Sequence, residues 1–506
     1  MRIGFRVDAN TFIGTGHVHR CMNLAREMLA RGHEITFLVG SNFNLNEILQ
    51  VGSGINIRHI SDCITSFSTG DETPKTPLTE VINDARCSRD LVLELGLELV
   101  VLDHYSMTND WLDVVKHESN CKVVVVDDVG RSWGSADYIL DSSIGAAGRY
   151  HSASLGCITM FGPAYVPLNP RYRGFVAEHK QAKDKLELVV FFGGVDAPNA
   201  TRRALAELVG VATNRLSVTV VIGEHNVHKE GLRREFEPHG FSFVEPADSM
   251  FDYLMNSDMS LGAGGTTTWE RLCLGVPSIV IGIAANQVSM TRELEALGCL
   301  QYLGRLEELA HGDIRMSVGS LLEDKWSREV LSVKGRTLVD GFGSSRICET
   351  IDPSSQEEFV LRESQVDDCL TLFRWVNEPE VRRSSLNSAE VSWVDHQSWF
   401  ESTSVNPEKV ILMAEVRDMP IAQIRFERLE EQIRLSYSVD PTQRGKGVGH
   451  WIVSQGVLWI RQRWHSPIVA EVRAENLASR RIFETLNFRQ GTSLKPDVLT
   501  FVLDVY

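Results

Sequence analysis

The segment Val439–Gly449, VDPTQRGKGVG, joins the end of an expected strand to a glycine-rich turn. A long amphipathic helix, expected at Gly449–Arg461, follows the turn directly. Small residues in such a turn let backbone N–H groups and the positive end of the helix dipole surround an anion such as a pyrophosphate. This stretch therefore predicts a binding site for a pyrophosphate-bearing molecule and fixes a strand-turn-helix unit in the C-terminal part of the chain.

The sequence around this turn predicts an α+β domain at residues 351–506. The segment Asp352–Glu358 has the small, polar composition of a linker. Three successive strands joined by short turns indicate an antiparallel meander. Besides the helix named above, the expected elements are Phe359–Arg362, Val366–Val376, Trp393–Phe400, Val410–Val416, Ile421–Phe426, Ile433–Val439, Ile468–Val472 and Leu477–Leu486.

Upstream of this domain, short apolar runs alternate with helical patterns, which is typical of parallel sheets covered on both faces. The pattern runs through two cycles, one starting at Ile3–Val7 and one at Leu186–Phe192. The sequence therefore predicts α/β architecture, with two Rossmann-like domains in series at residues 1–167 and 168–350. Ligands of such sheets bind beyond the carboxyl ends of the strands.

Composition excludes several classes of function. A chain of 506 residues is too long for a single core, and 43% hydrophobic with 23% charged residues is ordinary for a globular protein. The net charge of −16 argues against nucleic acid or anionic membrane as a general partner. The nine cysteines are scattered, which favours reduced thiols over disulfides or a zinc site. With neither a secretory signal nor an apolar run of about 20 residues, we expect a cytoplasmic protein.

Two segments of the C-terminal domain resemble the GNAT acetyltransferase superfamily. Gln443–Gly449 fits the pattern Arg/Gln-x-x-Gly-x-Gly/Ala, and Asn476–Phe488 contains Asn-x-x-Ser-x-x-x-Phe-Glu. The resemblance implies acetyl-CoA as co-substrate, with the backbone of Ser436–Val439 holding the pantetheine. The residues that it implies for acetyl-CoA binding are Val439, Gln443, Arg444, Gly445, Lys446, Gly447, Val448, Gly449, Asn476, Ser479 and Phe483.

Acetyl transfer to an amine also needs a base and a proton donor for the leaving thiolate. Many relatives carry Tyr where Phe483 stands, and Phe483 cannot donate a proton, so water or another residue must serve. Glu471 is the predicted base, with Glu475 as a second candidate; each is equally consistent with a solvated surface carboxylate. Asn377–Arg382 together with His396 resembles GNAT enzymes that acetylate nucleotide-linked amino sugars, although His396 also fits a packing residue.

The first strand leads into a glycine-containing loop that places His17 at the start of a helix. Gly14 and Gly16 let this loop turn tightly. A helix N-terminus disfavours the protonated imidazole, so His17 suits the role of general base. A histidine that only caps or packs the helix start is the alternative.

A second glycine-rich anion site is predicted in the middle of the chain. Gly264, Gly265, Thr266 and Thr267 open a helix with N–H groups suited to a diphosphate, and Glu270 can accept both hydroxyls of a ribose. This half of the chain resembles the nucleotide-sugar half of GT-B glycosyltransferases. The further residues expected at a UDP-sugar are Gly193, Gly194, Asn286 and Gln287.

Taken together, Gly-x-Gly-His-x-x-Arg, Asp103-His104-Tyr105 and these glycine segments closely resemble the UDP-sugar hydrolases of pseudaminic acid biosynthesis over roughly residues 1–345. The resemblance implies that His17 activates water, that Tyr105 and Asn286 position sugar or water, and that Gly14, Gly16 and Arg20 contribute to the UDP-sugar site. Inversion with C–O cleavage and no metal is expected.

The sequence thus predicts a bifunctional enzyme that acetylates a UDP-linked amino sugar with acetyl-CoA and then releases UDP. A GT-B glycosyltransferase that passes the sugar to an acceptor is one alternative. A degenerate acetyl-CoA-binding domain with a regulatory role is another. The sequence does not determine the oligomeric state.

Overall fold

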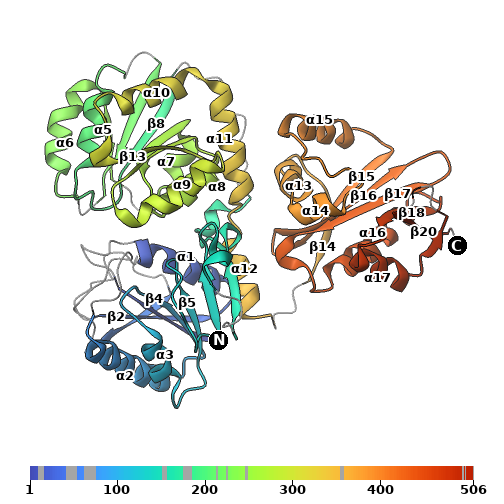
Figure 1. Cartoon of the computed structure of the whole chain (residues 1–506), viewed down its shortest axis with the longest axis horizontal. Helices are drawn as coiled ribbons and strands as arrows, with labels where there is room; N and C mark the ends of the chain where they lie inside the picture. Colours follow the sequence, from blue (N-terminus) through green and yellow to red (C-terminus); the bar gives the residue numbers. More distant parts are fainter. Residues whose placement is uncertain are drawn as a thin grey trace. The chain divides into compact units, whose positions relative to one another are not determined.

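The computed structural model describes residues 1–8, 16–40, 54–61, 76–150, 156–174, 185–211, 215–223, 226–245, 249–353, 358–492, 495 and 497–504. The chain divides into two compact units, Met1–Pro353 and Ser354–Tyr506. The first unit contains two sheets and the second contains one (Figure 1).

The first sheet has seven parallel strands in the order β3-β2-β1-β4-β5-β6-β7. The strands are β1 (Arg2–Val7), β2 (Glu34–Gly40), β3 (Ile55–Ile60), β4 (Leu99–Asp103), β5 (Lys122–Val126), β6 (Tyr138–Asp141) and β7 (Ile158–Phe161). The helices are α1 (Gly16–Ala30), α2 (Leu78–Leu95), α3 (Asn109–Lys116) and α4 (Ala146–Arg149). Ile3, Phe5 and Val7 are fully buried because helices cover both faces. The strand order reverses between β1 and β4, which is where ligands of such sheets bind.

The second sheet has six parallel strands in the order β10-β9-β8-β11-β12-β13. They are β8 (Leu186–Phe191), β9 (Leu216–Val221), β10 (Ser242–Val244), β11 (Met259–Ala263), β12 (Ser278–Gly282) and β13 (Gln301–Arg305). The helices are α5 (Ala200–Leu208), α6 (Lys229–Phe236), α7 (Phe251–Asn256), α8 (Thr267–Cys273), α9 (Val288–Ala296), α10 (Asp313–Glu323) and α11 (Lys325–Leu338). Its order reverses between β8 and β11, so the glycine segments after these two strands lie at its switch point.

One helix crosses from the second sheet back to the first. Helix α12 (Gly343–Ile351) follows α11 in sequence. Its residues Ile347, Cys348 and Ile351 are nonetheless buried in the apolar core beneath the first sheet, together with Val18 and Phe5. The core of the first domain therefore includes side chains from the end of the second.

The third sheet is mixed, with the order β14-β15-β16-β17-β18-β20-β19. Its strands are β14 (Val360–Glu363), β15 (Lys409–Val416), β16 (Met419–Arg428), β17 (Ile433–Val439), β18 (Ile468–Arg473), β19 (Arg489–Gly491) and β20 (Val498–Leu503). Its helices are α13 (Asp368–Val376), α14 (Pro379–Ser384), α15 (Trp393–Ser404), α16 (Val448–Arg461) and α17 (Leu477–Thr485). Strands β14 to β17 pair antiparallel, and β17 pairs parallel with β18.

The predicted α/β and α+β fold classes are confirmed: two Rossmann-like domains with parallel sheets precede an α+β domain with a mixed sheet. Short 3-10 helices complete the described chain at Pro163–Tyr165, Pro170–Tyr172, Glu237–His239, Ala285–Gln287, Leu306–Glu308 and Pro441–Gln443.

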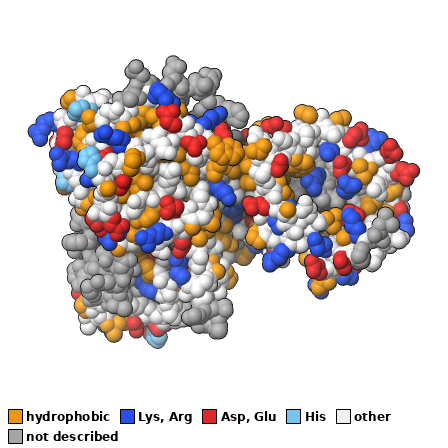
Figure 2. Space-filling model, turned by 45° about the horizontal axis from the view of Figure 1, so that its top comes forward, with side chains coloured by type: hydrophobic (Ala, Val, Ile, Leu, Met, Phe, Trp, Pro, Cys, Tyr) orange, Lys and Arg blue, Asp and Glu red, His pale blue; other side chains and the backbone are white. Residues whose placement is uncertain are grey.

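Among the described residues no helix combines the length and apolar character needed to cross a membrane. The eight cysteines in the described ranges are free thiols. Figure 2 shows acidic and basic side chains interspersed over the visible face, where the described residues form no broad basic stretch.

Candidate functional sites

His17 lies at the switch point of the first sheet, where α1 begins. Strands β1 and β4 are neighbours, and the last residue of β4, Asp103, pairs with Val7. This register carries Asp103 to the start of α1, where its Oδ1 lies 2.5 Å from His17 Nδ1. His17 is 7% exposed and Asp103 is 1% exposed. Because the carboxylate can only accept, this contact favours the tautomer with the proton on Nδ1 and with Nε2 as the free acceptor, while Arg20 Nη2 also lies 3.0 Å from Nδ1.

Arg20 completes this cluster from the next turn of α1. Its Nε lies 2.5 Å from Asp103 Oδ2 and its Nη2 lies 2.6 Å from Asp103 Oδ1. Nη1 lies 3.0 Å from Asp128 Oδ2. Burial alone would raise the pKa of Asp103, but Arg20 and His17 hold that pKa well below its usual range. Asp103 is therefore ionised at neutral pH, and the Arg20 guanidinium, predicted to bind the UDP-sugar, is occupied by two aspartates.

Tyr105 packs against the other side of His17. The two rings meet edge to face with centroids 4.6 Å apart. The Tyr105 hydroxyl donates to Asp128 Oδ2 at 3.2 Å, and burial, assisted by the charge of Asp128, raises the pKa of Tyr105 well above its ordinary value. Tyr105 thus stays protonated and fixes the imidazole plane. Gly14 lies outside the described residues, so its expected contact is not described.

The second predicted anion site approaches the first. A Cβ on Gly16, at the start of α1, would lie 3.5 Å from Thr266 Cγ2, which precedes α8. The turn before α8 is tight, since a Cβ on Gly264 would come within 2.5 Å of Thr291 Oγ1. Gly265 and Thr267 flank the exposed Thr266. The structure therefore brings together the starts of α1 and α8, both of which the sequence assigned to one UDP-sugar site.

A buried cation lies behind this turn. Arg271 is 1% exposed and donates to the carbonyl oxygens of Ala263 and Phe191, at the ends of β11 and β8, over 3.2 and 3.3 Å. Burial lowers the pKa of Arg271 to about 10, so it is charged at neutral pH. The neighbouring Glu270 is half-buried, and burial raises its pKa to about 7 while Tyr172 and Arg271 act in the opposite direction. Sequence reasoning missed Arg271.

The remaining predicted UDP-sugar residues also follow strand ends of the second sheet. Gly193 follows β8 with a φ of 96°, which favours glycine. Gly194 passes so close to Gly223 that a Cβ on Gly223 would lie 2.3 Å from its Cα. Asn286 is exposed on the 3-10 turn after β12. The carboxamide oxygen of Gln287 accepts from the Ile283 backbone N–H at 3.2 Å. This hydrogen bond stabilises the turn that contains Gln287.

In the C-terminal domain, β17 and β18 separate partway along their length. They pair only from Ile433 to Leu435 and from Ile468 to Ala470. Beyond these residues, Ser436–Val439 continue to pair with β16 on the other side. The backbone N–H and C=O groups of Ser436–Val439 that face β18 therefore make no strand pairing with it. An extended pantetheine chain would need such unpaired backbone groups.

The glycine turn after this strand is formed by its backbone. Gly445 and Gly447 have φ values of 77° and 84°, a region that favours glycine. Helices α16 and α17 approach each other closely at Gly449, because a Cβ at this position would lie only 2.9 Å from Ile482 Cδ1. Helix α16 begins at Val448, one residue earlier than expected. The backbone N–H groups of the turn therefore lie just after the part of β17 that no longer pairs with β18.

Several side chains predicted to bind acetyl-CoA are occupied by protein contacts. Arg444 donates to Glu378 at 2.7 Å and to Glu380. Lys446 donates to the buried Gln443 at 3.2 Å. These contacts shape the turn, and binding of acetyl-CoA by Gln443, Arg444 and Lys446 stays a prediction.

The second GNAT-like segment has a mainly structural role in the described contacts. Asn476 accepts from the Ser479 backbone N–H at 3.1 Å and caps α17. The Ser479 hydroxyl lies 2.9 Å from the Tyr437 hydroxyl. Phe483 is 2% exposed and packs against Phe488 and Phe501. Little of that ring is exposed in the fold, and a contact between Phe483 and acetyl-CoA stays a prediction.

The two candidate bases lie in different surroundings, and His396 is a packing residue. Glu471 is an exposed residue of β18, with Oε2 3.8 Å from Lys495 Nζ. Glu475 is exposed in the turn before α17.

His396 is 2% exposed, its Nε2 lies 2.9 Å from the Cys369 carbonyl oxygen, and aromatic rings surround it. The alternative interpretation of His396 therefore holds.

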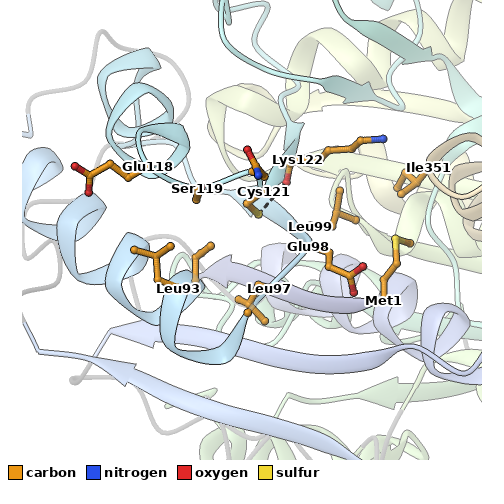
Figure 3. Close-up of a pocket in the computed structure, with 13 residues that line it drawn as sticks. Met1, Leu93, Leu97, Glu98, Leu99, Glu118, Ser119, Cys121, Lys122 and Ile351 are labelled. Atoms are coloured by element: carbon orange, nitrogen blue, oxygen red, sulfur yellow. Dashed lines mark hydrogen bonds between the residues drawn. The ribbon is translucent and has the colours of Figure 1, made fainter.

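A separate cavity of about 570 Å³ lies far from these groups in the first sheet. Met1, Leu99 and Lys122, at the amino ends of β1, β4 and β5, line it together with Ile351 (Figure 3). The His17 cluster occupies the opposite, carboxyl ends of the same strands. In the described ranges, no group of three or more His, Cys, Asp or Glu residues could hold a metal ion.

Comparison with known families assigns the C-terminal region. Residues 358–489 match the family described as Acetyltransferase (GNAT) domain. An N-acetyltransferase structure from Staphylococcus aureus is 18% identical and covers 29% of this chain and 99% of its own, with a TM-score of 0.26. MurG from Acinetobacter baumannii is 14% identical and covers 70% of this chain and 99% of its own, with a TM-score of 0.49.

Three curated proteins are similar in sequence. An uncharacterized protein of Methanocaldococcus jannaschii is 21% identical over 97% of each chain. The spore coat polysaccharide biosynthesis protein SpsG of Bacillus subtilis is 24% identical over 52% of this chain and 78% of its own. A pseudaminic acid cytidylyltransferase and UDP-2,4-diacetamido-2,4,6-trideoxy-beta-L-altropyranose hydrolase of Helicobacter pylori is 23% identical over 40% of this chain and 37% of its own. The chain therefore has a GNAT domain in its C-terminal region, and its N-terminal part is distantly similar to sugar-nucleotide biosynthesis proteins.

Proposed function

We propose that this chain is a bifunctional nucleotide-sugar enzyme that N-acetylates a UDP-linked 4-amino sugar and hydrolyses the acetylated product to free sugar and UDP. The observation that carries the proposal is the His17–Asp103 pair at a sheet switch point, with the α8 turn facing the start of α1. A base and an anion site opposite each other are what displacement of UDP by water needs.

In the hydrolytic step, His17 Nε2 removes a proton from a water molecule as its oxygen attacks the anomeric carbon. The bond between that carbon and the diphosphate oxygen breaks, and its electron pair leaves with UDP. Asp103, whose pKa is held below its usual range by Arg20 and His17, stabilises the imidazolium that forms. The attack comes from the face opposite UDP, so the configuration inverts. His17 returns the proton to solvent.

The negative charge that develops on UDP is stabilised by the second domain. The backbone N–H groups after Gly264 receive the diphosphate, and the buried charge of Arg271 behind the turn adds a positive potential that water does not screen. Glu270 accepts the ribose hydroxyls when it is ionised. These groups need no metal, and we propose hydrolysis without one.

In the acetyl transfer, the free edge of Ser436–Val439 and the N–H groups that open α16 hold acetyl-CoA. Glu471 accepts the proton of the attacking amine. The carbon–sulfur bond breaks after the amine nitrogen has bonded to the acetyl carbon, and the thiolate needs a proton. Phe483 cannot supply it, and we assign this role to the Tyr437 hydroxyl, whose contact with Ser479 lies beside the separated strands. Burial raises the pKa of Tyr437, which keeps it protonated.

The proposed substrates are UDP-4-amino-4,6-dideoxy-N-acetyl-β-L-altrosamine for the acetylation and UDP-2,4-diacetamido-2,4,6-trideoxy-β-L-altropyranose for the hydrolysis. Similarity to the Helicobacter pylori hydrolase supports the second, and the GNAT match supports acetyl-CoA as donor. Joining the two activities is chemically sensible because the product of the first is the substrate of the second.

The test is mass spectrometry of the 4-amino UDP-sugar incubated with the whole chain, with and without acetyl-CoA. We expect a singly acetylated UDP-sugar, free diacetamido sugar and UDP only when acetyl-CoA is present. If neither an acetylated species nor a free hexose forms, both assignments are wrong. If UDP appears only after an acceptor sugar or lipid is added, the N-terminal half is a glycosyltransferase instead.

A further inference from the structure

Arg425 is a cation of the C-terminal domain that neither proposed reaction uses. It is half-buried on β16, its Nε donates to Ser436 Oγ at 3.0 Å, and its guanidinium lies 5.2 Å from the ring centroid of Trp399. Within the described part of the chain, Arg425 forms no salt bridge with a carboxylate. The acid with most influence on it, Glu427, bonds to Lys409 and Arg434 at 3.2 and 3.1 Å.

A half-buried guanidinium without a carboxylate is unfavourable unless an anion approaches it, because burial removes part of its hydration. Burial accordingly lowers the pKa of Arg425. Ser436 and Trp399 orient the group but do not neutralise it. This is the environment of a binding residue for an anion that comes from solution.

The face of the sheet on which Arg425 lies follows from strand alternation. A Cβ on Gly456 of α16 would lie 2.8 Å from Ile424 and 3.4 Å from Phe426, so these side chains face α16. Arg425, between them, faces the other side. Figure 1 shows α13 to α15 on that side and α16 with α17 on the opposite one, in agreement with the contact between Arg425 and Trp399 of α15.

Arg425 belongs to a row of polar residues across three neighbouring strands. It pairs with Ser436, and the residues before Ser436 and Glu471, Leu435 and Ala470, pair with each other. Paired residues of neighbouring strands share a face, so Arg425, Ser436 and Glu471 all lie on the side away from α16. They stand at the level where β17 and β18 separate, which is where the acetyl group is transferred in the proposed reaction.

We propose that Arg425 binds the diphosphate of a nucleotide-linked amino sugar while the sugar's amine lies at Glu471. This inference rests on the proposed acetyltransferase function and specifies how its acceptor is recognised. Arg425 and Glu471 lie two strands apart, and because β17 and β18 separate at this level their backbones are more than two regular strand spacings, about 10 Å, apart. A 4-amino group lies across the pyranose ring from the anomeric oxygen that carries the diphosphate, so one substrate can span the two residues.

The test compares two amines in the whole chain: the UDP-linked 4-amino sugar and the same 4-amino sugar without nucleotide. Arg425→Met is expected to reduce the preference for the linked amine, measured as the ratio of the two kcat/KM values, by about 10- to 100-fold. The KM for acetyl-CoA should stay unchanged. Arg434→Gln is the matched control, because Arg434 is also a β-strand arginine but is paired with Glu427.

UDP provides a second measurement with an identified probe. It should inhibit acetylation of the nucleotide-free amine competitively in the wild type and about 10-fold more weakly in Arg425→Met. An equal loss of kcat/KM for both amines in Arg425→Met, or an unchanged ratio, would overturn the inference while leaving the acetyltransferase assignment intact. If the wild type acetylates neither amine, the proposed function fails and this acceptor site fails with it.

Discussion

The site around His17 is assembled from side chains of distant segments, whereas the site at Gly445–Gly449 is formed by the backbone of one continuous segment. His17, Asp103 and Asp128 meet only because β1 and β4 pair and Arg20 bridges the two aspartates. The glycine turn depends on positive φ values at two positions and on a strand that loses its neighbour. The first site should therefore be sensitive to side-chain chemistry and the second to backbone geometry. Four experiments test this contrast.

The largest effect is expected from His17→Ala. It removes the base, so UDP release should fall by about 10³-fold, while acetylation by the same protein continues at the wild-type rate. Both rates can be measured in one reaction by following UDP and free CoA. UDP release that persists at the wild-type rate would remove His17 from the mechanism.

Tyr437→Phe tests whether the acetyltransferase site, which is otherwise formed by backbone groups, depends on one side chain. The substitution deletes the hydroxyl 2.9 Å from Ser479 Oγ and keeps the ring. We expect kcat for acetylation to fall by about 10²-fold with little change in the KM for acetyl-CoA. UDP release from the diacetamido substrate is the internal control. Full acetylation activity would show that water protonates the thiolate.

The pH dependence of UDP binding tests Glu270, whose pKa is raised to about 7. Below this pH the carboxyl is protonated and accepts hydrogen bonds from the ribose less well; above it the carboxylate is ionised. UDP affinity, measured by calorimetry, should therefore increase by up to about 10-fold between pH 6 and pH 8. Glu270→Gln should remove this dependence. An identical profile in the variant would assign the titration to another group.

The smallest effect is expected from Arg444→Gln. Its guanidinium is paired with Glu378 and Glu380, so the KM for acetyl-CoA should change by less than about 3-fold, as for a partly exposed ion pair. Steady-state kinetics with varied acetyl-CoA provide the measurement. A rise of more than about 10-fold would restore Arg444 to the cofactor site that its sequence motif implied.

The fold class can be predicted from the sequence because strand and helix periods are local properties. The sequence also indicates His17 and the glycine turns, which follow strand ends that the pattern reveals. Asp128 and Arg271 could not be recognised, since an acid after a strand and an arginine inside a helix have many ordinary roles. Their importance depends on which strands become neighbours.

Short elements with little apolar periodicity were also missed. Strand β7 has two exposed residues among its four. Strand β19 is a short edge strand in which Arg489 and Gln490 are exposed. At Phe483 the motif predicts a ligand contact, and the fold adds what the motif does not reveal, namely that the ring packs against Phe488 and Phe501.

The passage of α12 into the first domain bears on how the chain matures during synthesis. Ile347, Cys348 and Ile351 fill part of the core below the first sheet, but the ribosome adds them only after the whole second domain. The core of the first domain is consequently incomplete until that helix arrives. A fragment that stops at residue 167 should be prone to aggregate for this reason.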